Sequence, residues 1–141
     1  MTHCVFCDIV AGRADASVVR EDARTLAFVG FRQPTDCHVL VVPKRHVETI
    51  HALDDDDAAA LMQAAVRVAR ALDAAVPMQG LSLWQSNGPA AWQEVPHVHL
   101  HLLPRRTGDG LLDIYPGGEP GTPPRADLDA MAARLRAVLS D

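Results

Sequence analysis

Three histidines occupy alternate positions of an apolar run in the stretch His97-Val98-His99-Leu100-His101-Leu102-Leu103. A β-strand sends successive side chains to opposite faces of its sheet, so this pattern predicts a strand with one apolar face and one face of imidazoles. Neighbouring imidazoles in such a row lie roughly 7 Å apart along the strand. No core needs three imidazoles side by side. The pattern therefore predicts a sheet protein in which this row handles protons, a metal or a phosphoryl group.

The composition is typical of one soluble globular domain. The chain has 141 residues, of which 48% are hydrophobic and 22% charged, and this is enough to bury a core. The formal net charge of −5 argues against a nucleic-acid partner held by bulk electrostatics, but it allows a single nucleotide. No apolar run approaches the length of about 18 residues that a membrane span needs, so no membrane partner is expected.

The N-terminus and the cysteine count indicate a cytoplasmic protein. The sequence Met1-Thr2-His3-Cys4 lacks the basic and apolar segments of a secretory signal. The three cysteines are an odd number, which favours a reducing compartment and metal binding over disulfides.

Hydrophobic periodicity predicts an α+β fold: an antiparallel sheet of about five strands, one main helix across it and a second helix at the C-terminus. We expect a single domain over residues 1–141, with its core at about 4–106. The predicted elements in chain order are a short helical turn near 7–11, strands at 18–20, 25–29 and 38–42, a helix from 54 to 77, strands at 81–86 and 95–103, a Gly- and Pro-rich loop at 113–124 and a helix at 127–139.

Four consecutive aspartates, residues 54–57, stand at the start of the predicted main helix. The helix dipole favours acidic side chains in a first turn. We therefore interpret this run as a solvated helix start rather than as a metal site.

The middle histidine of the row is the candidate nucleophile. A neutral imidazole can attack phosphorus when its other ring nitrogen donates to a fixed acceptor, and His99 has a histidine on each side to orient it. His101 could supply a donor to the charged phosphate oxygens. The alternatives are a catalytic metal site and, for any single member of the row, an ordinary core histidine.

The pair Cys4 and Cys7, in the pattern Cys-x-x-Cys, is a candidate half-site for zinc. Two more ligands are needed, and His46 and His97 are candidates for a Cys₂His₂ set. A redox pair is the alternative, but the βαβ pattern that accompanies such pairs is absent. We interpret Cys37 as a small buried residue.

Two further segments carry polar groups that could serve a site. His38 and His46 stand at opposite ends of the predicted strand 38–42 and its extension Pro43-Lys44-Arg45-His46, so each could serve a different site. The loop 86–94 offers backbone N–H groups with Ser86, Asn87 and Gln93 as side-chain donors, which suits an anion near the histidine row. A solvated turn and a plain hairpin connection are the respective alternatives.

Together these pieces resemble the histidine-triad (HIT) superfamily of nucleotidyl hydrolases and transferases. Its signature is His-φ-His-φ-His-φ-φ, with φ apolar, and residues 97–103 match it without a gap. The similarity runs from Cys4 to about Arg105 and includes Gln93 and the segment Pro43-Lys44-Arg45-His46. The resemblance implies a homodimer of α+β protomers with a nucleotide cleft on each.

The resemblance also implies a role for each candidate residue. His99 would attack the α-phosphate of a nucleotide conjugate and form a covalent nucleotidyl-histidine, which water then hydrolyses. His101 and His38 would orient around the phosphate, and Gln93 would hold phosphoryl oxygens or the leaving group. A structural Zn²⁺ and no organic cofactor are expected, and the zinc ligands of members with Cys-x-x-Cys correspond to Cys4, Cys7, His46 and His97.

Several positions depart from the family pattern where the nucleoside would bind. Gly30 replaces an Asp or Asn that binds ribose, and Ser86 replaces an Asn or Gln, with Asn87 one place away. Glu94 occupies a position where Ser or Thr often touches the phosphate, and Trp92 replaces a glycine. The Cys-x-x-Cys pattern and residues 43–46 resemble a branch that cleaves adenosine phosphoramidates, whereas residues 47–53 and 104–109 are similar to a branch that cleaves diadenosine polyphosphates. The resemblance therefore implies either an adenosine phosphoramidate or a dinucleoside polyphosphate as substrate. The alternative is a zinc-stabilised nucleotide- or protein-binding module with little catalysis.

Overall fold

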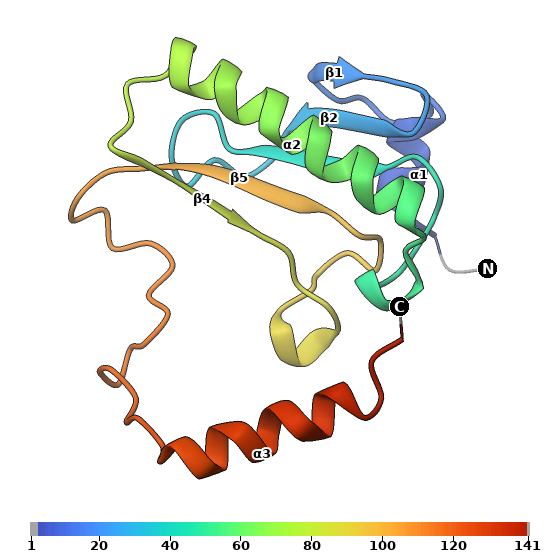
Figure 1. The fold of residues 1–141 in the computed structure, drawn as a ribbon. Helices are drawn as coiled ribbons and strands as arrows, with labels where there is room; N and C mark the ends of the chain where they lie inside the picture. Colours follow the sequence, from blue (N-terminus) through green and yellow to red (C-terminus); the bar gives the residue numbers. More distant parts are fainter. Residues whose placement is uncertain (1–2, 141) are drawn as a thin grey trace. The chain divides into compact units, whose positions relative to one another are not determined.

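The computed structural model describes residues 3–140. Five antiparallel strands form one sheet in the order β1-β2-β3-β5-β4, which confirms the predicted α+β class (Figure 1). The strands are β1 (Val18–Glu21), β2 (Thr25–Val29), β3 (Val39–Pro43), β4 (Gly80–Trp84) and β5 (Leu100–Arg105). The helices are α1 (Val5–Val10), α2 (Asp55–Ala75) and α3 (Arg125–Arg136), and the short 3₁₀ turns are η1 (Ile50–Ala52) and η2 (Pro89–Ala91).

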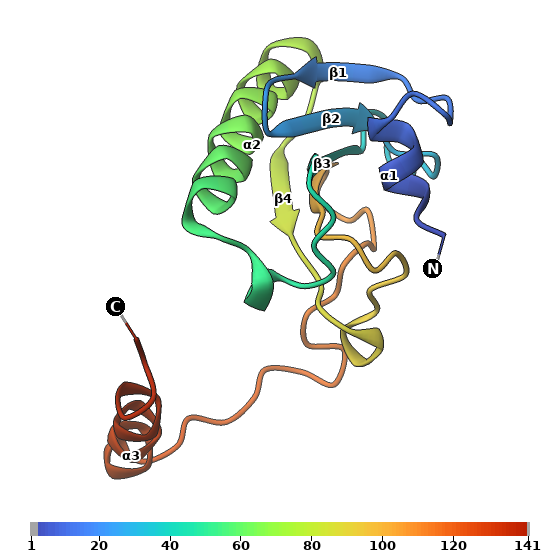
Figure 2. The same ribbon diagram turned by 90° about the vertical axis from the view of Figure 1, so that its right-hand side faces the viewer.

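The main helix α2 covers one face of the sheet, and α1 lies on the opposite face (Figure 2). Asp54 caps α2 by accepting the backbone N–H of Asp57, and the helix ends before Pro77, as the sequence predicts. Its apolar side packs on the sheet through Leu61, Ala64, Ala65, Val68 and Leu72. On the other face, Phe6 and Ile9 of α1 pack against Leu26, Phe28, Leu40 and Val42.

The strand that carries the histidine row is displaced from its predicted position. It begins at Leu100 rather than at residue 95, because β3 pairs with it only at Val39, Leu40 and Val41, and the chain after Pro43 turns away from the sheet. It also continues through Pro104 to Arg105. A proline is tolerated there because only β4 pairs with β5 at that position, so no N–H is required toward β3.

The alternation of the row holds outside the strand as well. Val98, Leu100 and Leu102 belong to the cluster of side chains packed against α2. The rings of His97 and His99 contact Phe6 of α1 on the other face. The period of two therefore places the imidazoles and the apolar side chains on opposite faces, as predicted, and the structure shows that the imidazole face is the one covered by α1.

The chain divides into two compact units, one ending at Asp109 and one beginning at Gly110. The second unit contains α3 after a stretch, 113–124, without helix or strand, as predicted for that loop. The single domain over residues 1–141 stays a prediction. Among the described residues, no helix combines the length and the apolarity needed to cross a membrane.

Candidate functional site

One hydrogen bond sets the chemical state of His99. Its Nδ1 lies 2.7 Å from the carbonyl oxygen of His97, and because a carbonyl only accepts, this nitrogen carries the proton. Nε2 is then left with its lone pair in the neutral ring. The edge of Phe6 supports the imidazole, with ring centroids 5.0 Å apart. His99 is buried and held in the tautomer that a nucleophile needs.

His38 and His101 form a second, linked pair of imidazoles. Nδ1 of His38 donates to the carbonyl of Arg32 at 3.2 Å, so Nε2 of His38 accepts. His101 Nδ1 donates to that nitrogen at 3.0 Å, which leaves Nε2 of His101 with a lone pair. The His101 ring centroid lies 4.7 Å from that of His99. The pair can therefore pass protons beside the candidate nucleophile.

Burial keeps all of these rings neutral. Desolvation lowers the pKa of His38 and of His99 below the usual value, and it lowers the pKa of His101 to about 3. The imidazoles of His99 and His38 add to the effect on His101. At neutral pH the site therefore holds uncharged imidazoles with lone pairs, which suits nucleophilic attack on an anionic phosphate ester or amide.

The side chains predicted at the mouth of the site brace its loops. The Gln93 amide donates to the carbonyl of Glu48 at 2.6 Å and accepts the N–H of Gly88 at 2.7 Å. Asn87 accepts the N–H of Ile50 at 2.7 Å and exchanges hydrogen bonds with Gln85. These contacts hold the turn before the triad against the segment that contains η1.

Two other predicted residues of this loop lie close by. The carbonyl of Ser86 accepts from the Gln85 side chain. Glu94 forms an exposed ion pair with Arg32 at 3.2 Å, which joins this loop to the loop that carries the His38 acceptor. Contacts of Ser86, Asn87, Gln93 and Glu94 with a phosphate stay predictions.

The departures at residues 30 and 92 have distinct structural contexts. A Cβ added at Gly30 would lie 3.3 Å from Nδ1 of His38, so this glycine allows the close approach of the His38 ring. Trp92 is 89% exposed and has a left-handed backbone with φ of 62°. Its side chain is presented to solvent directly before Gln93.

Four residues converge to form a candidate metal centre. Cys4 caps α1, Cys7 lies within α1, His46 follows β3 and His97 precedes β5. One potential ligand atom from each lies within 4.8 Å of all the others. The separations include 3.4 Å from Cys4 Sγ to His97 Nδ1, 3.3 Å from Cys7 Sγ to His46 Nδ1 and 3.2 Å between the two Nδ1 atoms. These separations are similar to the spacing of about 3.3–3.8 Å that is expected between the ligand atoms of a tetrahedral zinc site.

The tautomer of His97 also fits metal binding. Its Nε2 donates to the carbonyl of Pro43 at 2.8 Å, so Nδ1 presents a lone pair toward the two thiols. Burial raises the pKa of the Cys7 thiol to about 11, and Cys4 adds to this effect. Redox-active thiols have a lowered pKa, so this environment argues against the redox alternative.

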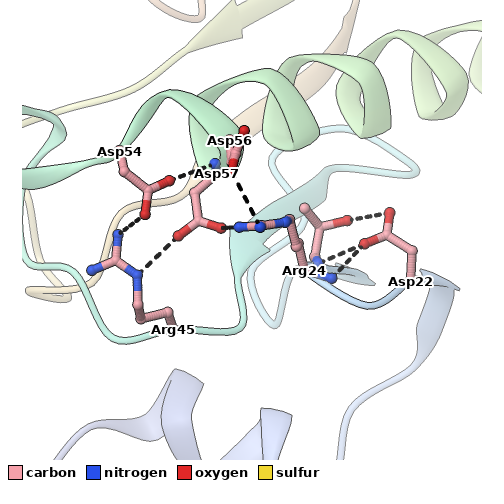
Figure 3. Close-up of polar contacts among 7 residues, drawn as sticks. Asp22, Arg24, Arg45, Asp54, Asp56 and Asp57 are labelled. Atoms are coloured by element: carbon pink, nitrogen blue, oxygen red, sulfur yellow. Dashed lines mark hydrogen bonds and ion pairs between the residues drawn. The ribbon is translucent and has the colours of Figure 1, made fainter.

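An ion-pair cluster supports the loop that carries His46 (Figure 3). The buried carboxylate of Asp57 accepts from Arg24 at 2.9 Å and from Arg45 at 2.9 Å. Arg45 immediately precedes His46, and its guanidinium also pairs with Asp54 at 3.2 Å. The first turn of α2 is thereby tied to the β3 end of the candidate metal centre. The interpretation of residues 54–57 as a solvated helix start is therefore wrong for Asp57, which is buried and paired with these two arginines.

Sequence reasoning missed two aromatic residues in the site. Phe6 lies between the two cysteines and contacts His97 and His99 with its ring edge-on. Trp84 pairs with His101 across β4 and β5, and their rings stack at 4.3 Å. The strand register, once known, would have indicated Trp84, because directly opposed residues share a face.

A family model described as the HIT domain matches residues 11–108 of this chain. The chain is 38% identical over 114 residues to Protein hit of Bacillus subtilis, covering 80% of this chain and 79% of that protein. It is 32% identical over 117 residues to adenosine 5'-monophosphoramidase HNT1 of Saccharomyces cerevisiae, covering 82% of this chain and 72% of that protein.

Two solved structures extend the similarity to the fold. SMU.412c from Streptococcus mutans has a TM-score of 0.88 and 36% identity, covering 97% of this chain and 85% of that chain. A Zn-bound histidine triad family protein from Mycobacterium smegmatis has a TM-score of 0.72 and 33% identity, covering 96% of this chain and 97% of that one. The chain therefore belongs to the HIT family, and Cys4, Cys7, His46 and His97 fit its zinc-containing subgroup.

Proposed function

We propose that this protein is a nucleotidyl hydrolase that cleaves at the α-phosphate of a nucleotide conjugate through a covalent nucleotidyl-His99. The observation that carries the proposal is the 2.7 Å hydrogen bond from His99 Nδ1 to the carbonyl of His97, which leaves Nε2 available for attack. The yeast relatives named adenosine 5'-monophosphoramidase support a phosphoramidate substrate. A dinucleoside polyphosphate is the other substrate class for the same chemistry.

In the first step, His99 Nε2 forms a bond to the α-phosphorus, and the bond from phosphorus to the leaving group breaks with its electron pair on that group. The bound anionic phosphate raises the pKa of His101, so its Nε2 takes up a proton from solvent when the substrate binds and passes it to the leaving group. His38 accepts the hydrogen bond from the other nitrogen of His101 and stabilises the charged ring.

In the second step, water attacks the nucleotidyl-His99, and Nε2 of His101 takes its proton. The P–N bond breaks, the nucleoside monophosphate leaves and His99 returns to its neutral state. As the product leaves, His101 releases this proton to solvent, so each imidazole ends the cycle as it began. Gln93, Asn87, Ser86 and Glu94 are proposed to lie around the phosphate and its nucleoside.

We propose that the candidate metal centre holds a structural Zn²⁺ on Cys4, Cys7, His46 and His97. The ion would cross-link α1, the end of β3 and the start of the histidine row, and no step of the reaction passes through it. We further propose a cytoplasmic homodimer that binds small-molecule nucleotides, as the family resemblance implies.

The proposed function is tested with adenosine phosphoramidates and diadenosine polyphosphates as substrates. Wild-type protein should release a nucleoside monophosphate, and His99→Ala should lose at least about 10³-fold in kcat/KM because no nucleophile remains. His51→Ala, which changes an exposed histidine, should keep wild-type activity. Equal turnover by wild type and His99→Ala contradicts the proposal. Nucleotide binding without turnover favours the binding module.

A further inference from the structure

Trp84 lies against the two histidines of the proton-passing pair. It is paired with His101 across β4 and β5, so both side chains project from the same face of the sheet. The two rings are parallel to within 1°, with centroids 4.3 Å apart. The His38 ring lies at 5.8 Å from the indole and within 10° of its plane. One indole therefore stacks with both imidazoles that share the 3.0 Å hydrogen bond.

The surroundings of this pair disfavour a positive charge. Burial lowers the pKa of His101, and the neighbouring imidazoles of His99 and His38 lower it further. On the β3 side, His38 meets the carbonyl of Arg32, and Leu40 is the neighbour of His101. The carboxylate of Glu94 raises the pKa of His99, but this effect is smaller than the lowering caused by burial. Besides the lone pair of His38 Nε2, the indole face of Trp84 is thus a group in contact with His101 that attracts a cation, because an aromatic face is electron-rich.

We propose that Trp84 is a positioning residue: it holds the His38 and His101 rings parallel and favours the charged form of His101 while a proton passes through it. The catalytic part of this inference rests on the proposed function. The stacking and its electrostatic effect stand on the geometry alone. A half-buried tryptophan that only filled space would change stability when replaced, but it would leave the protonation of His101 unchanged.

The test compares Trp84→Phe and Trp84→Leu with wild type by NMR of the histidine ring protons. In wild type the His101 signals should be shifted upfield by the indole ring current. With AMP bound, the apparent pKa of His101 should be lower by about half a unit in Trp84→Leu, because the cation–π contact is lost. Trp84→Phe keeps an aromatic face and should restore most of both effects. Trp92→Leu removes the other tryptophan and should leave the His101 signals unchanged.

Steady-state kinetics supply the second measurement. Trp84→Leu should reduce kcat about 3- to 10-fold with KM within twofold of wild type, and Trp84→Phe should recover most of the loss. Unchanged His101 shifts and pKa in a folded Trp84→Leu overturn the inference. If that variant does not fold, the non-aromatic Trp84→Met takes its place, and unchanged His101 shifts and pKa in Trp84→Met overturn the inference. A wild type without turnover overturns the proposed function alone, because the NMR comparison does not depend on turnover.

Discussion

Backbone carbonyls determine which nitrogen of each buried imidazole carries the proton. The carbonyl of Pro43 accepts from Nε2 of His97, the carbonyl of His97 accepts from Nδ1 of His99, and the carbonyl of Arg32 accepts from Nδ1 of His38. A carbonyl cannot donate, so each contact leaves the opposite nitrogen with a lone pair. Two of these lone pairs have separate uses: that of His97 faces the thiols, and that of His99 is the proposed nucleophile.

Neutral buried histidines make the free energy of unfolding depend on pH. The folded pKa of His101 is about 3, below its usual value of 6.5, so the unfolded chain takes up a proton first as the pH falls. This contribution to stability is present above pH 6.5 and is lost toward the folded pKa. Between pH 7.5 and pH 5, the protonation of His101 alone should lower the free energy of unfolding by about 2 kcal/mol. Carboxylates titrate mostly below this window.

Urea unfolding of wild type and His101→Gln at the two pH values measures this difference. Between the two pH values, the free energy of unfolding should fall by about 2 kcal/mol less in the variant than in wild type. The contributions of the other titrating groups cancel in this comparison. An equal loss in both proteins would mean that His101 is not held neutral in the folded state.

At the scale of elements, Asp57 connects α2 to the β3 end of the candidate metal centre through its ion pairs with Arg24 and Arg45. Asp57 is 4% exposed and its carboxylate accepts from two guanidiniums, whereas its neighbour Asp56 is exposed and its carboxylate lies 3.4 Å from the Arg24 guanidinium (Figure 3). The pKa of the Asp57 carboxyl is lowered by its hydrogen bonds with Arg24 and Arg45, against the opposing effect of burial. The two adjacent aspartates form a matched pair for mutation.

We expect Asp57→Asn to lower the free energy of unfolding by about 1–3 kcal/mol, since it removes a buried charge that both arginines require. Asp56→Asn should change it by less than about 0.5 kcal/mol, as is usual for an exposed ion pair. Equilibrium unfolding in urea gives both values. Similar effects of the two substitutions would show that the buried clamp does not stabilise the fold.

The elements also show what hydrophobic patterning can and cannot predict. The spacing of Leu61, Ala65, Val68 and Leu72 correctly predicted α2, and the alternation at 97–103 correctly predicted that the imidazoles lie opposite the apolar side chains. The predicted start of β5 was wrong, because strand pairing depends on where β3 leaves the sheet. Trp84 and Asp57 were missed since their partners are distant in sequence and are known only from register and packing.

At the scale of the whole chain, the residues of the candidate metal centre come from α1, the end of β3 and the histidine row. Cys4 and His97 are 93 positions apart, yet their ligand atoms lie 3.4 Å from each other. No local pattern predicts such a contact: the residue types made His46 and His97 candidate ligands, and the family resemblance implied the full set. Because His97 also holds His99 through its carbonyl, order at the metal centre supports order at the proposed nucleophile.

We expect purified protein to contain about one zinc per chain and to lose stability when it is removed. A strong chelator or Cys4→Ser should lower Tm by about 10 °C or more, because zinc binding contributes directly to folding. Cys37 is not among the four candidate ligands, so Cys37→Ser is the matched control. Instant loss of activity on chelation with an unchanged Tm would instead indicate a catalytic metal.

The covalent nucleotidyl-His99 is the central claim, and mass spectrometry of the intact protein tests it most directly. Wild type is mixed with substrate and quenched within the first turnover by denaturant at alkaline pH, since phosphohistidine bonds are labile in acid. The account predicts an added mass of one nucleoside monophosphate less water, located on His99 and absent from His99→Ala. Turnover without this adduct, or with the adduct on another residue, would contradict it.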